Sequence, residues 1–165
     1  MKIYLIRHGL AEEQDEHEDD TSRPLTPEGV KKTQQVAKHL KELKMKFDLI
    51  LTSPLLRAQQ TAKILEEEKL STTLQVADYL APNQEIEAWV TWLESWKDRK
   101  DESSLALVGH QPGLGNWAEM LVYGIVKDGL VLKKAGLIGL LLPNNGTPVG
   151  RSQLFWLTSP KLLLG

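Results

Sequence analysis

The sequence of 165 residues contains no cysteine, which excludes disulfide bonds, cysteine-ligated zinc and a thiolate nucleophile. It also lacks a strong charge of either sign. A net charge of −2 gives no electrostatic reason to expect nucleic acid or an anionic membrane as a partner. No apolar run reaches the roughly 20 residues of a membrane-spanning helix. The first apolar run is too short for a secretory signal, so we expect a cytoplasmic protein.

What is present is typical of one globular domain over residues 1–165, with 41% hydrophobic and 25% charged residues. Apolar spacing and turn residues predict strands that alternate with helices. The strands are expected at residues 3–6, 47–52, 72–76 and 104–108, and the helices at about 27–43, 54–67, 84–98 and from Pro112 onward. This alternation predicts an α/β fold with three α/β/α layers around a mostly parallel central sheet.

Two further segments depart from the alternation. Residues 137–142 and 153–158 are apolar and flank a turn that contains Asn145-Gly146, so they predict a late antiparallel hairpin. The polar stretch 11–23 contains seven acidic residues and almost nothing to bury, which predicts a long exposed loop. Thr26 and Pro27 then carry the signals of an N-cap and a first helical residue.

Cationic and imidazole side chains follow three of the predicted strands. Arg7 and His8 end the first strand, Arg57 lies in the first turn after the second, and His110 follows residues 104–108. Gly9 is expected to take a positive φ as the chain turns away from the strand. Because the carboxyl ends of parallel strands share one edge of a sheet, we expect Arg7, His8, Arg57 and His110 to converge.

Two arginines and two histidines would form a cationic pocket whose natural guest is a phosphoryl group. One unit-charge pair at 4 Å contributes on the order of 4 kcal/mol at an effective dielectric constant near 20. A neutral histidine can attack phosphorus, and neighbouring arginines lower its pKa. Activity should therefore fall in acid as His8 is protonated, and a flat rate from pH 5 to 8 would argue against His8 as the nucleophile.

Three segments together resemble the signatures of the histidine phosphatase superfamily, which has the phosphoglycerate-mutase-like fold. They are Leu5-Ile6-Arg7-His8-Gly9, Ser53-Pro54-Leu55-Leu56-Arg57-Ala58-Gln59-Gln60-Thr61-Ala62 and Val108-Gly109-His110. The short chain and the segment Arg23-Pro24-Leu25-Thr26 resemble most the SixA-type phosphohistidine phosphatases of that superfamily.

This resemblance implies a role for each site residue. His8 would be the phosphorylated nucleophile, whereas Arg7, Arg57 and His110 would bind the phosphoryl oxygens. It implies no metal and no organic cofactor. The substrate would be a phosphohistidine on a signalling or phosphotransfer protein, such as a His-containing phosphotransfer domain.

The sequence departs from the superfamily at one position. Many members carry a glutamate general acid after the third strand, where residues 78–84 of this chain contain none. Asp20 lies where the SixA-type pattern has an acidic residue, so we take Asp20 as the candidate acid. Two alternatives stay open: a phosphatase of small phosphate esters, and a non-catalytic module that binds phosphate or a phosphoprotein.

Overall fold

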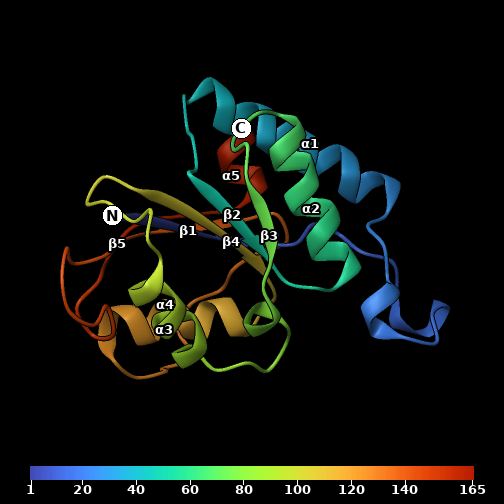
Figure 1. The fold of residues 1–165 in the computed structure, drawn as a ribbon. Coiled ribbons are helices and arrows are strands. Elements are labelled where there is room, and N and C mark those ends of the chain that lie inside the picture. Colours follow the sequence, from blue (N-terminus) through green and yellow to red (C-terminus); the bar gives the residue numbers. More distant parts are fainter.

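The computed structural model describes all residues 1–165, and its centre is one mixed sheet with the strand order β3-β2-β4-β1-β5-β6 (Figure 1). The first four strands in sequence are parallel, β5 is antiparallel to β1, and β6 is antiparallel to β5. The strands are β1 (Lys2–Arg7), β2 (Leu49–Thr52), β3 (Leu74–Val76), β4 (Ser104–Gly109), β5 (Leu137–Leu141) and β6 (Gln153–Thr158). The predicted hairpin is therefore confirmed.

Helices cover both faces of the sheet, which confirms the three-layer prediction (Figure 1). One face carries α1 (Pro27–Glu42), α2 (Leu56–Glu67) and the short α5 (Pro160–Leu164). The other face carries α3 (Glu87–Ser95) and α4 (Gly113–Tyr123). The central strands are continuous apolar runs because each of their faces packs against a helical layer.

Helix ends explain most differences from the predicted boundaries. The start of α1 is as predicted, with the Thr26 hydroxyl accepting the Gly29 N–H at 2.9 Å. The second helix begins at Leu56 rather than at residue 54, with Leu55 as its N-cap. The third is shorter than predicted, because its N-cap is Ile86 and Trp96 is extended after it. None of the helices is long and apolar enough to cross a membrane.

The acidic stretch 11–23 is more ordered than an exposed loop. It contains two short 3₁₀ helices, η1 (Gln14–Glu16) and η2 (Asp20–Ser22). Ala11 pairs with Leu25 across its base, and the Arg23 guanidinium donates to the Glu12 carbonyl at 2.9 Å. These bonds fold the stretch back on itself, so η2 lies against α2 near the carboxyl end of the sheet.

Candidate functional site

The four residues predicted to converge do lie together. In the β1–β4 pairing Arg7 lies opposite Gly109, so His8 and His110 leave the sheet side by side, with ring centroids 5.2 Å apart. The Arg57 Nε atom approaches His8 Nε2 at 3.4 Å. All four line a cavity of about 270 Å³, together with Ala11, Asp20, Arg23, Pro82, Gln111 and Lys134.

The imidazole of His8 is buried and oriented. Its Nδ1 lies 2.7 Å from the Gly9 carbonyl oxygen, which can only accept, so Nδ1 carries the proton and the Nε2 lone pair accepts the Arg57 Nε–H. Burial lowers the pKa of His8 to about 3, and the charges of His110, Arg57 and Arg7 act in the same direction. The neutral form therefore persists well below pH 5. This result corrects the expected pH profile, because a flat rate from pH 5 to 8 is now compatible with a His8 nucleophile.

The turn after β1 is fixed by close packing rather than by an unusual backbone angle. The positive φ expected at Gly9 is wrong: Gly9 is not among the residues with positive φ. A Cβ at Gly9 would instead overlap the Thr33 hydroxyl of α1, and a Cβ at Gly29 would overlap the Leu10 carbonyl group. The Gly9 N–H donates to the Thr61 hydroxyl of α2 at 3.0 Å. Both helices thus hold the turn that presents His8.

Ser53 is a site residue that the sequence did not reveal. It follows β2 and is fully buried, and its hydroxyl lies 2.7 Å from His110 Nε2. Burial lowers the pKa of His110 to about 4, with the Arg57 charge next in size. The sequence pattern Ser53-Pro54 reads as a helix cap, so nothing local indicated a partner 57 positions away.

Asp20 is paired with two arginines. Its Oδ2 lies 3.2 Å from Arg57 Nη2, its Oδ1 accepts from Arg23 Nε at 2.8 Å, and its carbonyl accepts from Arg57 Nη1 at 2.8 Å. Burial raises the pKa of Asp20, but the bonds and charges of Arg23 and Arg57 outweigh burial and leave that pKa below its ordinary value. An ionised Asp20 is suited to orienting Arg57, whereas a proton donor needs a raised pKa.

Two nitrogens in the site are buried without a hydrogen-bond partner: Arg7 Nε and His110 Nδ1. Arg7 makes one side-chain hydrogen bond, from Nη1 to the Leu132 carbonyl at 2.9 Å. Unpaired buried donors are costly, and a bound oxyanion is the kind of partner that would satisfy them.

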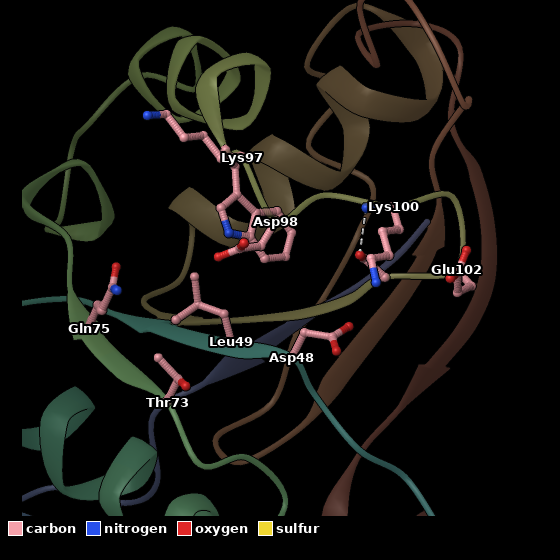
Figure 2. A pocket seen from close by; sticks show the side chains of 10 residues that line it. Asp48, Leu49, Thr73, Gln75, Lys97, Asp98, Lys100 and Glu102 are labelled. Carbon is pink, nitrogen blue, oxygen red and sulfur yellow. Dashed lines mark hydrogen bonds between the residues drawn. The ribbon is translucent and has the colours of Figure 1, made fainter.

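A larger cavity lies elsewhere, at the amino end of β2 and β4, with a volume of about 500 Å³ (Figure 2). Asp48, Lys97, Asp98, Lys100 and Glu102 give its wall charges of both signs (Figure 2). None of the predicted site residues lines it.

A cluster of Glu12, Glu16 and His17 places donor atoms suited to a metal within 4.8 Å of one another. These residues are exposed or half-exposed on a loop, and His17 already pairs with Glu12 at 2.6 Å.

Comparison with known proteins agrees with this geometry. A family model described as "Histidine phosphatase superfamily (branch 1)" matches residues 3–104. An uncharacterised protein of Picosynechococcus sp. is 45% identical over 99% of both chains. The phosphohistidine phosphatase SixA of Escherichia coli is 29% identical over 70% of both chains. A solved structure of a protein histidine phosphatase SixA complexed with tungstate superposes with a TM-score of 0.84, covering 99% of both chains at 24% identity.

Proposed function

The chain belongs to the histidine phosphatase superfamily (branch 1), and from this premise we propose that it hydrolyses phosphohistidine on a protein through a phosphorylated His8. One observation carries the proposal. His8 is buried and neutral, its Nδ1–H is bound to the Gly9 carbonyl, and its Nε2 lone pair lies beside Arg57 in a cationic cavity.

The reaction has two steps. In the first, His8 Nε2 attacks phosphorus, the bond between phosphorus and the substrate's imidazole nitrogen breaks, and that nitrogen takes up a proton from solvent, which the water consumed in the second step returns. In the second, water attacks the phosphorus of phospho-His8 and releases orthophosphate and neutral His8. The sum is phosphohistidine and water giving histidine and phosphate, with no other reactant required.

The other site residues act on the charge of the phosphoryl group. Arg7 and Arg57 supply guanidinium donors, which suit phosphoryl oxygens because they bind in a fixed fork. Arg7 Nε and His110 Nδ1, which lack a hydrogen-bond partner in the protein, donate to the oxygens of an oxyanion when it binds. Ser53 then donates to His110 Nε2, which leaves His110 Nδ1 as the donor.

The proposed reaction does not require a strong general acid beside the leaving group. The nitrogen that leaves from a phosphoramidate is readily protonated, whereas an alkoxide needs a strong acid beside it. Asp20 is held ionised by Arg23 and Arg57. We therefore assign Asp20 to orient Arg57, and this assignment favours phosphohistidine over phosphate esters as substrate.

The acidic stretch also bears on the substrate. The segment carries seven carboxylates on residues 12–20, of which Asp20 lines the cavity, and together they repel small free anions and offer a surface to a basic partner. This charge supports a protein substrate. The similarity to Escherichia coli SixA, whose name gives it phosphohistidine phosphatase activity, supports the same class.

The decisive experiment traps the intermediate. Brief incubation with a phosphohistidine protein carrying labelled phosphate should leave acid-labile, base-stable label on the wild-type chain and none on His8→Ala. His39→Ala, which removes a half-exposed histidine of α1, is the matched control and should keep the label. Label that survives His8→Ala would remove His8 from its role.

A substrate panel separates the rival functions. The value of kcat/KM for phosphohistidine protein should exceed that for small phosphate esters. Equal or faster turnover of esters would make the chain an ester phosphatase. Binding of phosphate without turnover of any substrate would make it a binding module.

A further inference from the structure

Glu119 is a buried carboxylate that the proposed reaction does not use. It lies in α4 and is 1% exposed. A buried carboxylate is costly unless hydrogen bonds satisfy it. Its Oε1 accepts the N–H groups of Gly129 at 2.7 Å and Leu130 at 3.0 Å, and its Oε2 accepts the Lys127 N–H. One side chain thus accepts hydrogen bonds from three main-chain N–H groups of the same loop.

This loop, residues 125–136, connects α4 to β5 without regular structure and returns to the site. Its Leu132 carbonyl accepts from Arg7 Nη1 at 2.9 Å. Its Ala135 N–H lies within bonding distance of two carbonyls, that of Arg7 at 3.1 Å and that of His8 at 3.2 Å. Lys134 lines the cavity. The loop therefore touches the end of β1 through side chain and main chain.

Leu130 connects the buried carboxylate to the part of the loop that contacts Arg7. Its N–H is bound to Glu119, and its carbonyl accepts from Gln111 Nε2 at 3.2 Å. Gln111 follows His110 and also accepts the Gly115 N–H of α4 at 3.0 Å. The peptide groups of Leu130 are fixed from both sides, two residues before the carbonyl that holds Arg7.

We propose that Glu119 is a positioning residue for Arg7: by fixing residues 127–130 it holds the Leu132 carbonyl where it orients the guanidinium toward the oxyanion. The proposal rests on the proposed function only in taking Arg7 as a ligand of the phosphoryl group. Leu132 is the one partner of the Arg7 side chain, and Arg7 Nε has none, so displacement of this carbonyl frees the guanidinium.

The charge state of Glu119 fits this role. Burial raises the pKa of Glu119, but the N–H groups of Lys127, Gly129 and Leu130 outweigh burial and leave the pKa below its ordinary value. The carboxylate is ionised and accepts at both oxygens. Glu119→Gln replaces one of these oxygens with an NH₂ group, which cannot accept a hydrogen bond.

The test measures the affinity for tungstate, a tetrahedral oxyanion, by calorimetry in four chains: wild type, Glu119→Gln, Arg7→Ala and the double variant. Glu119→Gln should weaken binding about tenfold in the wild-type background and less than about twofold in the Arg7→Ala background, because coupled residues are not additive. Glu94→Gln is the matched control: it makes the same substitution at an exposed glutamate of α3, away from the loop, and should keep the wild-type affinity.

Two results would decide against the proposal. An unchanged affinity in Glu119→Gln, or the same loss in both backgrounds, would overturn it. If Glu119→Gln does not fold, Glu119→Asp takes its place, because it keeps the charge but shortens the reach to the loop, and the same dependence on Arg7 is required. Wild type that binds tungstate but hydrolyses no phosphohistidine would refute the proposed function and leave this inference standing.

Discussion

The sheet has a cavity at each end, and the two differ in more than size. At the amino end, a cavity of about 500 Å³ is lined by exposed acids and lysines (Figure 2). At the carboxyl end, the cavity is about 270 Å³, and four cationic side chains face one acid, Asp20. Volume alone would direct attention to the end of the sheet that lies away from the proposed site.

Burial is what separates the two cavities. Arg57 is 4%, His110 6% and His8 7% exposed, so water solvates these groups poorly. A buried guanidinium is costly without an opposite charge, and a buried imidazole N–H is costly without an acceptor, whereas exposed charges at the amino end are solvated whether or not a ligand binds. A binding site is therefore recognised by buried polar groups that lack hydrogen-bond partners, such as Arg7 Nε and His110 Nδ1. Paired variants at the two ends of the sheet can test this.

The largest difference is expected in catalysis. Arg57→Ala removes a donor that stabilises the phosphoryl group, so kcat/KM for phosphohistidine protein should fall by a factor on the order of 100 to 1000. Lys97→Ala at the amino end should leave kcat/KM unchanged. Steady-state kinetics on both variants, with thermal melting to confirm folding, checks the pair. A comparable loss in Lys97→Ala would give the larger cavity a part in the reaction.

Acid should destabilise the folded protein because His8 and His110, at the carboxyl end of the sheet, are buried in the neutral form. The folded-state pKa values of about 3 for His8 and about 4 for His110 lie below the ordinary value of 6.5. Between these values and 6.5 the unfolded chain binds more protons, so the free energy of unfolding should fall as the pH falls, on the order of 1 kcal/mol per pH unit for each histidine. Over pH 5 to 8, kcat/KM should show no loss from His8 protonation.

Urea unfolding at several pH values measures this slope. His8→Ala should reduce the slope between pH 4 and 6. Equal slopes in wild type and His8→Ala would contradict a neutral, buried His8.

A smaller effect is expected from a pair of buried serines. Ser53→Ala removes the hydroxyl that orients His110, so kcat should fall about tenfold. Ser103→Ala removes a buried serine that lines the amino-end cavity, where its hydroxyl accepts the Lys100 N–H at 2.8 Å. That change should lower stability only, as kinetics and melting together would reveal. An unchanged kcat in Ser53→Ala would remove its hydroxyl from the site.

The smallest effect is expected at Asp48. Its carboxylate accepts the Ser104 N–H at 2.8 Å on the exposed rim of the larger cavity. Asp48→Asn should cost about 1 kcal/mol of unfolding free energy or less and no activity. Urea unfolding and kinetics on the same preparation check both parts, and a loss of activity would refute the division between the two ends.

The sequence predicted those features that short patterns encode. An apolar run that ends in Arg7-His8-Gly9 and two later strands ending near Arg57 and His110 correctly predicted that these side chains converge, because the carboxyl ends of parallel strands share an edge. Asn145-Gly146 likewise predicted the hairpin of β5 and β6. These features depend on local composition and on one topological rule.

What the sequence missed depends on contacts between distant segments. The bond of Ser53 to His110 and the loop N–H groups bound by Glu119 leave no periodic trace, because main-chain donors exist at every residue. The prediction of a positive φ at Gly9 was wrong for a related reason. A glycine is required there because a Cβ would overlap Thr33, and no local pattern indicates a neighbour 24 positions away. Register and packing, rather than propensity, decide such contacts.

The contact of the turn after β1 with α1 has an evolutionary consequence. At both Gly9 and Gly29 a methyl group would already overlap a neighbouring atom, so the seat of the nucleophile tolerates no side chain on either wall. Substitutions at Gly9 or Gly29 that would adapt the pocket to a different guest molecule are therefore disfavoured. Substitutions that change the guest molecule are therefore expected in the two flanking segments, 11–23 and 125–136, at positions outside the bonds that hold Arg7 and Arg57.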